Sequence, residues 1–301
     1  MDFRILVGGK DETKTFRGIL KSIKTLDNEG VQSDTATIDL IDKQNISFPK
    51  VGKKLEIFFA ETRIGTYTVS RVQATSSNTI TISAKANDYK SEMTTVLRKR
   101  KWETSLGNVV LEISNKYSLN SFVPEEVRSL VIREMQSESD AHFLTRIAKE
   151  RRLVFKADAT NLAIHNKENP NLPTVRLEKI YSWTYEESLL KTYTGIKSFF
   201  LDTKTGERVE VNVGDPSNQY VLDLTWSREE EAKAKASNKL AEFSSQKKYL
   251  TTVSSFLPVS FGQKVEITAC REGVDGTWVV SSVEHQLDQT GAKTTLKLGA
   301  K

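Results

Sequence analysis

Short runs of alternating apolar and polar residues recur along the first 86 residues. In one of them Leu55, Ile57 and Phe59 fall on one side of the chain. A period of two with one apolar side is the pattern of a half-buried antiparallel strand. Similar runs cover residues 16–26, 35–41, 67–72 and 79–84. Several short strands separated by turn residues predict a β-barrel or a β-sandwich.

The same pattern returns near the C-terminus. Residues 51–72 read VGKKLEIFFAETRIGTYTVSRV, and residues 261–283 read FGQKVEITACREGVDGTWVVSSV. Two unrelated β-meanders could share such a composition by chance, but the shared Gly-Thr-aromatic turn favours a duplicated fold unit. A glycine between alternating strands marks a turn or a close approach of the backbone. The residues that define the repeat are Gly52, Gly65, Tyr67, Gly262, Gly276 and Trp278.

The middle of the chain has helical periodicity instead. Apolar residues recur at helical spacing in 105–117 and in 139–151, and Ser139 is a suitable N-cap for the second helix. Strands at 153–157 and 162–165 follow, and a proline-containing loop lies within 161–178. This segment is predicted to be a small α/β module.

Strands resume at 199–201 and 209–213, joined by a Thr-Lys-Thr-Gly turn. One long helix is predicted at about 228–248, followed by strands from residue 250 onward. The predicted fold is therefore mainly β with an α+β insert, in which two β-barrels flank a small α/β module. The expected division is a first barrel at 1–95, the module at 96–178 and a second barrel with the long helix at 179–301.

Composition narrows the class of protein. The chain has 301 residues, of which 38% are hydrophobic and 28% charged, as expected for folded domains. The single cysteine, Cys270, excludes an internal disulfide and a zinc site with four cysteines. No stretch approaches 18 apolar residues, and no signal peptide or membrane span is expected.

Candidate chemistry is sparse. The three histidines, His142, His165 and His285, lie far apart and outside any metal-binding or nucleophile motif. A pair of carboxylates could serve a glycosidase, but 39 Asp and Glu residues always offer such a pair. We therefore expect no enzyme activity and predict no catalytic residue, no metal site and no cofactor.

The most concentrated charge is a basic run. Arg98, Lys99, Arg100 and Lys101 precede Trp102. A basic run beside an aromatic residue can bind phosphate backbones, can be a solvated connector, or can contact an acidic face of another subunit. The last interpretation is preferred, so these five residues are the candidate subunit or partner interface, and specific nucleic-acid binding is not expected.

The order of these features resembles the late control gene D family of phage tail proteins, the baseplate hubs of contractile tails. The resembling stretches are 31–34, 35–40, 64–67, 82–88, 97–102, 106–110 and 138–148. The resemblance implies two tail-tube-like barrels around an α/β module, similar to the N-terminal part of VgrG spike proteins. The sequence stops at Lys301, directly after the last strand, so a fused needle is not expected and a separate spike protein is.

The resemblance also implies a homotrimer. Two related barrels in each of three chains would make six barrel units, which match a hexameric tail tube on one side and a trimeric spike on the other. Expected partners are the tail tube and spike proteins, with tape measure and baseplate wedge proteins as further ones. The expected location is the tail baseplate of a virion or tailocin, assembled in the bacterial host cytoplasm. The alternative is a peptidoglycan-binding or wall-hydrolysing tail protein, because residues 104–124 faintly resemble a LysM module.

Overall fold

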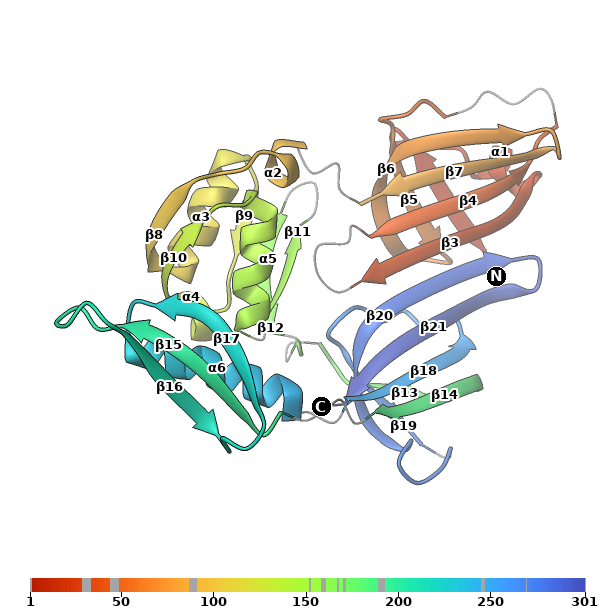
Figure 1. Cartoon of the computed structure of the whole chain (residues 1–301). Helices are drawn as coiled ribbons and strands as arrows, with labels where there is room; N and C mark the ends of the chain where they lie inside the picture. The colour runs from red at the N-terminus through yellow and green to blue at the C-terminus, as the bar shows by residue number, and fades with distance from the viewer. Residues whose placement is uncertain are drawn as a thin grey trace.

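The computed structural model describes residues 2–28, 34–43, 49–86, 91–151, 153–157, 161–166, 168–169, 172–188, 193–244, 247–268 and 270–300. Two β-rich units lie on one side of the molecule, and two mixed units lie on the other (Figure 1). The prediction of a mainly β chain with an α+β insert is confirmed.

The first β unit contains seven strands whose neighbours are all antiparallel. Their order in the sheet is β3 (Leu20–Asn28), β4 (Thr35–Ile41), β7 (Thr79–Lys85), β6 (Thr62–Thr75), β5 (Lys54–Phe59), β1 (Phe3–Val7) and β2 (Lys10–Asp11). The expected strand at 16–26 begins later, because Phe16 lies in the short helix α1 (Thr13–Arg17) and packs into the core from there.

The second β unit repeats this order. Its strands are β14 (Ile180–Ser188), β18 (Lys247–Ser255), β21 (Gly291–Ala300), β20 (Gly276–Asp288), β19 (Lys264–Ile267) and β13 (Val175–Leu177). From β14 to β19 they correspond one by one to β3, β4, β7, β6 and β5, with the same antiparallel pairing. The units differ at the last strand, because β13 pairs with β19 in parallel whereas β1 pairs with β5 antiparallel.

The two units also share irregularities of the backbone. A register shift follows Val69 in β6 and the corresponding Val280 in β20. At the extra residue, Ser70 donates a hydrogen bond to a carbonyl of β7 at 3.1 Å, and Ser281 donates one to a carbonyl of β21 at 2.9 Å. A bulge increases twist and re-aims a strand. The same bulge with the same serine therefore gives both sheets the same local curvature.

The two units join edge to edge in one sheet. The second half of β20, from Ser282 to Asp288, pairs antiparallel with β3, from Asn28 back to Ser22. Leu287 of β20 packs into the core of the first unit. The joint thus combines backbone hydrogen bonds with apolar burial.

The α/β module has its own hydrophobic core. Its elements are α2 (Ser91–Thr95), β8 (Arg100–Ser105), α3 (Leu106–Lys116), β9 (Asn120–Phe122), α4 (Glu125–Arg128), β10 (Val131–Gln136), α5 (Asp140–Glu150), β11 (Leu153–Ala157) and β12 (Asn161–Asn166). The predicted cap is confirmed, because Ser139 accepts a hydrogen bond from the backbone N–H of His142.

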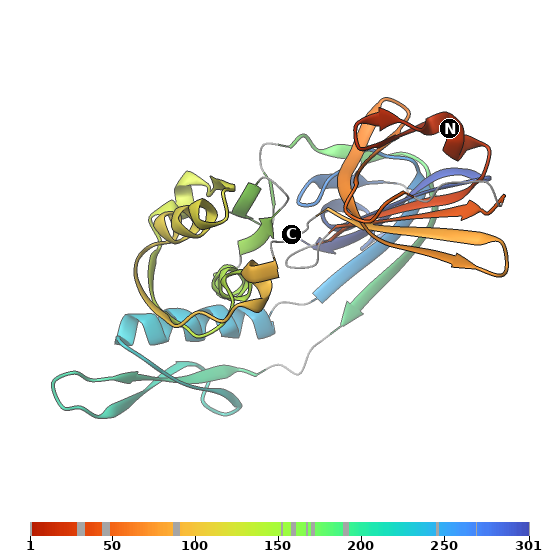
Figure 2. The same ribbon diagram turned by 90° about the horizontal axis from the view of Figure 1, so that it is seen from above.

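A fourth unit is inserted between β14 and β18. It consists of β15 (Gly195–Leu201), β16 (Arg208–Gly214), β17 (Gln219–Trp226) and α6 (Glu229–Ser244). Its sheet is separate from the large one, although residues 179–301 were expected to form one barrel with the helix. In Figure 2, α6 lies between this sheet and α5 of the α/β module. The exact domain bounds stay a prediction, but the long helix belongs to the insertion.

His285 makes the joint between the β units sensitive to pH. It lies opposite Thr25, is packed by Phe59 and Phe256, and hydrogen-bonds Thr294 Oγ1 at 3.0 Å. Burial lowers the pKa of this imidazole to about 4, and nearby Asp27 opposes that shift only weakly. The neutral ring is therefore the form that the folded joint contains.

We expect the unfolding free energy to fall as the pH drops from 6.5 towards 4. In this range the unfolded state binds a proton on His285, whose ordinary pKa is about 6.5, and the folded state does not. The loss should reach about 2 kcal/mol at pH 5 relative to pH 7.5. Denaturant titrations at both pH values measure it. His285→Gln should remove most of this loss and the exposed control His142→Gln should not; an equal loss in all three proteins contradicts the assignment.

Candidate functional site

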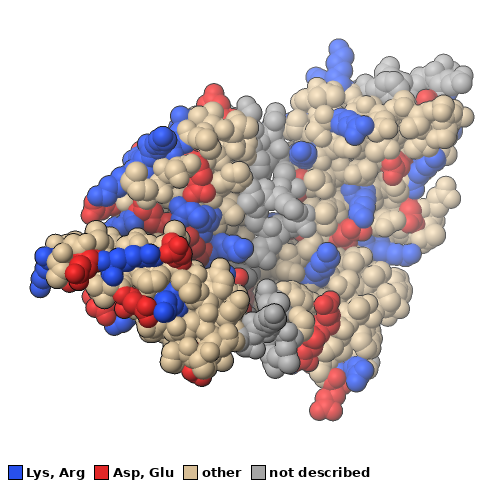
Figure 3. Space-filling view, viewed as in Figure 1, with Lys and Arg blue, Asp and Glu red and all other residues tan. Residues whose placement is uncertain are grey.

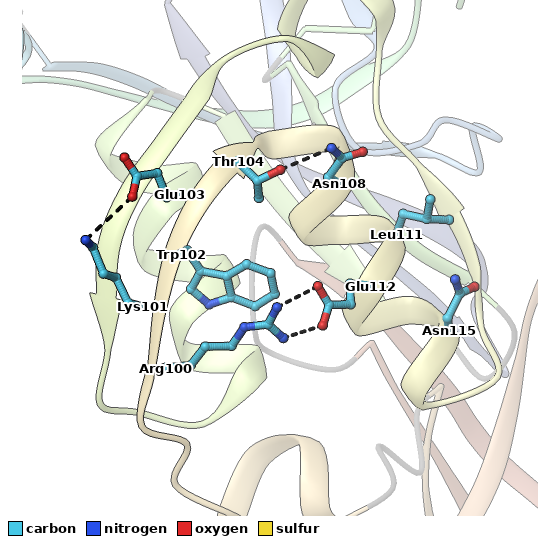
Figure 4. Close-up of a pocket in the computed structure, with 9 residues that line it drawn as sticks. All are labelled: Arg100, Lys101, Trp102, Glu103, Thr104, Asn108, Leu111, Glu112 and Asn115. Atoms are coloured by element: carbon cyan, nitrogen blue, oxygen red, sulfur yellow. Dashed lines mark hydrogen bonds and ion pairs between the residues drawn. The ribbon is translucent and has the colours of Figure 1, made fainter.

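The basic run leads into β8 at one edge of the α/β module, and its last two residues, Arg100 and Lys101, begin this strand. Together with α3 it borders an open groove of about 620 Å³ (Figure 4). Arg100 forms a two-armed ion pair with Glu112 of α3, and Lys101 lies 3.5 Å from Glu103. Arg98 approaches Asp140 at 3.9 Å. Three of the four cations in the run are thus balanced by carboxylates of the same module.

Trp102 is not a surface anchor, contrary to its predicted role in the interface. Only 2% of it is exposed. Its ring stacks on Phe143 at 5.9 Å between centroids, and its N–H donates to Gln136 Oε1 at 2.8 Å. The alternation of β8 turns this side chain inward, and the Arg100 guanidinium lies over it at 3.7 Å. Trp102 therefore stabilises the module.

Asp140 is the buried acid beneath the run. It accepts hydrogen bonds from Lys116 at 2.6 Å, Tyr117 at 2.8 Å and Gln136 at 2.7 Å. Burial alone would raise the pKa of Asp140, but these donors outweigh it and the net shift is downward. The carboxylate stays ionised and offsets the positive charge above it.

The surface around the run carries both signs of charge. Lys and Arg alternate with Asp and Glu over the mixed units (Figure 3). Within the described residues, Lys99 is the cation of the run without an ion pair, and it is exposed. A phosphate-binding face needs several unpaired cations close together. The arrangement fits a protein contact better than a nucleic-acid site, and the interface role of residues 98–101 stays a prediction.

A second charged cluster joins the inserted unit to the module. Glu134 of β10, whose side chain is 5% exposed, contacts Arg146 of α5 at 2.5 Å and Arg151 at 2.9 Å. Lys235 of α6 lies 3.1 Å from the same carboxylate and also pairs with Glu150. Burial tends to raise the pKa of Glu134, but the three cations hold it at about 2. The sequence did not indicate this cluster, because its members are separated by as many as 101 residues.

The glycines of the repeat occupy equivalent turns. Gly52 and Gly262 have φ angles of 88° and 78°, a region that favours glycine. Their N–H groups donate to Val69 and Val280 at 2.8 and 2.9 Å. The turns therefore hold β5 to β6 and β19 to β20 in the same way.

The other members of the repeat pack under these turns. Tyr67 lies opposite Leu55, and Trp278 lies opposite the corresponding Val265. Both aromatic rings are buried. A Cβ on Gly65 would come within 2.5 Å of the Tyr67 side chain, whereas Gly276 has open space but a φ of 138°. Glycine is thus required at the two equivalent positions for different reasons.

The remaining candidate groups do not converge. His142 is exposed on α5, His165 lies in β12, and His285 lies in the joint between the β units. The described part of the chain contains no group of three or more His, Cys, Asp or Glu side chains that could hold a metal ion. In the same residues no helix has the length and apolar character that crossing a membrane requires.

The fold is that of phage tail proteins. The 43 kDa tail protein of prophage MuSo2 from Shewanella oneidensis has a TM-score of 0.74 and 14% identity, with 99% of this chain and 98% of that chain covered. A tail protein from Neisseria meningitidis MC58 has a TM-score of 0.74 and 13% identity, with 100% and 97% covered. The type VI secretion component c3393 of E. coli has a TM-score of 0.61 and 9% identity, with 93% and 73% covered.

In sequence, the chain is similar to two proteins named probable baseplate hub protein. The one from Escherichia phage P2 is 28% identical over 158 residues, which are 49% of this chain and 41% of that protein. The one from Escherichia phage 186 is 24% identical over 222 residues, 67% of this chain and 56% of that protein. The chain thus spans about half the length of these curated relatives, and no protein-family model matches it. The predicted resemblance to baseplate hubs of the late control gene D family is confirmed.

We expect Glu134→Gln to destabilise the protein by about 3 kcal/mol, because removing one partner of a buried ion cluster leaves the other charges uncompensated. Glu112→Gln is the matched control, and it should cost under about 1 kcal/mol because its pair with Arg100 is exposed. Denaturant unfolding at pH 7 measures both. Equal, small effects would show that the Glu134 cluster does not hold the inserted unit in place.

Proposed function

We propose that this chain is a structural hub of a phage-type tail baseplate. In this proposal three copies form a ring that connects a hexameric tail tube to a trimeric spike. The similarity to named baseplate hub proteins and the tail-protein fold support the structural role.

The observation that carries the proposal is the pair of equivalent β units in one continuous sheet. Strand order, register, turn glycines and bulges agree between the units. Three such chains present six similar β units while keeping threefold symmetry elsewhere. A closed ring needs complementary head-to-tail contacts, and duplication lets one chain meet partners of both symmetries.

The proposed partners are the tail tube protein and the spike protein, with tape measure and baseplate wedge proteins as additional contacts. The proposed location is the baseplate of a virion or tailocin, reached after assembly in the host cytoplasm. We propose no enzymatic step. The α/β module and the inserted unit are linked through Glu134 and Lys235. In this proposal these two parts make contacts outside the ring, and those contacts would vary.

Co-expression with the tail tube and spike proteins of the same genome tests the proposal. We expect the three proteins to copurify, and light scattering should show three copies of this chain in the complex. Absence of both partners from the purified chain contradicts the hub assignment. Retention on peptidoglycan, with lysis bands in a zymogram, would favour the wall-binding alternative instead.

The proposed contact of the basic run has its own test. We expect Lys99→Glu with Lys101→Glu to reduce recovery of a partner in the same copurification by at least about tenfold, because both side chains are exposed and the run would meet an acidic face. The matched control is Lys53→Glu with Lys54→Glu on the first β unit. Unchanged recovery removes the run from the interface. Loss of steeply salt-dependent DNA binding would instead support the nucleic-acid interpretation.

A further inference from the structure

The joint between the two β units uses two particular strand edges. On β20, the strand β19 pairs with residues up to Val279, and Val280 donates to Gln263 in the preceding turn. From Ser282 onward, β3 takes the place of β19 along the same side of β20. The joint is thus formed by the late half of β20 and the outer edge of β3, which comes first in the strand order of the other unit.

The structure contains a second copy of each edge. The late half of β6, Arg71–Thr75, corresponds to Ser282–Gln286 of β20. The strand β14 corresponds to β3 and ends the sheet in Figure 1. Among the described residues, β5 pairs with β6 no further than Thr68, and no strand follows it on that side. Within the same part of the chain, β18 is the single partner of β14.

We propose that these two edges pair with each other between neighbouring copies of the chain. Residues 71–75 of β6 in one copy would lie antiparallel to residues 184–188 of β14 in the next copy. This inference rests on the proposed ring and specifies the contact that builds it. The contact runs from head to tail, so it propagates around a ring and closes when the rotation per copy allows.

The joint within the chain predicts the register between copies. In it, Glu284 lies opposite Leu26, and Gln286 lies opposite Lys24. The bulge after Val69 and Val280 aligns β6 with β20, and a register shift before Ser22 and Ser182 aligns β3 with β14 in the same way. By this equivalence Gln73 would lie opposite Glu186 of the next copy, and Thr75 opposite its Thr184.

Charges at the two free edges are complementary. In the joint within the chain, Lys24 and Glu284 form a diagonal ion pair at 2.9 Å. By the equivalence above, that diagonal becomes Gln73 and Thr184 between copies. The next diagonal of the same kind, two residues along each strand, joins Arg71 to Glu186 of the next copy. Both residues are exposed, and neither has an ion pair within the described residues. The proposed register therefore brings opposite charges together in an arrangement that the chain already uses.

The free edge of β14 also exposes aromatic surface. Trp183 is 37% exposed, whereas the corresponding residue in the covered joint, Ile23, is fully buried. Tyr181 on the same strand is exposed as well. A long edge strand with exposed apolar side chains is a site for pairing with another chain. A second copy of β6 would pair with residues 184–188 of this edge, directly next to Trp183.

Cysteine cross-linking tests the register. In a Cys270→Ser background, Gln73→Cys is combined with Glu186→Cys in the full chain, which is co-expressed with the tube and spike proteins. Both positions are exposed, so the substitutions leave the core intact. Mild oxidation should link each copy to the next. A non-reducing denaturing gel should then show two-chain and three-chain species, and a reducing gel the single chain.

Two controls define the result. Gln73→Cys with Ser182→Cys is four residues out of register and should remain a single chain. Lys24→Cys with Gln286→Cys spans the joint within the chain and should close without any increase in mass. The second designed pair, Thr75→Cys with Thr184→Cys, should behave like the first.

The outcomes separate this inference from the proposed function. In one case three copies copurify with the tube and spike, and the disulfide within the chain forms. If both designed pairs between copies then remain single chains, the proposed joint is overturned and the hub role stays intact. If the unmodified chain copurifies with neither partner, the hub role and the joint both fail. Arg71→Glu should lower the recovery of three-copy complexes, and adding Glu186→Arg should restore it; no restoration argues against the register.

Discussion

Backbone hydrogen bonding at strand edges is the constraint on which the rest of this structure depends. A strand edge presents N–H and C=O groups that need partners. Within the chain, β3 and β20 satisfy each other, and the two β units become one sheet. This arrangement fixes their relative position more tightly than side-chain packing between closed units would, because register is set residue by residue.

On the other side of the molecule, ion pairs fix the relative position of the two mixed units. Glu134 receives cations from α5, from the residue that follows α5, and from α6. The burial of such a cluster is costly unless every member has a partner, and here the partners come from two separately folded units. The inserted unit is therefore attached by directional contacts that tolerate little displacement.

The β units were predictable from the sequence where local pattern decides structure. The alternation at 54–59 and the shared Gly-Thr-aromatic turn identified strands and repeat, because both depend on neighbouring residues. The strand β14 was missed because most of its side chains are exposed, so apolar alternation is absent. The hairpin of the inserted sheet was predicted at 199–201 and 209–213. Its separation from the second β unit and the Glu134 cluster were missed, because both depend on contacts between residues far apart in the chain. Trp102 was misplaced because its neighbours Arg98–Lys101 suggested a surface, whereas strand alternation turns it inward.

The pairing of β3 with β20 has a consequence for the timing of synthesis. The strand β3 ends at Asn28 and β20 begins at Gly276, so the ribosome makes the α/β module and the inserted unit between the two partners. The edge of β3 in the first β unit therefore has no partner strand while the α/β module and the inserted unit are being synthesised. Contacts so distant in sequence form slowly, and an exposed edge in the meantime is open to association with the wrong strand. A chain of this design gains from a delay in self-association until β20 has been made, because only then can its two units pair through each other's edges.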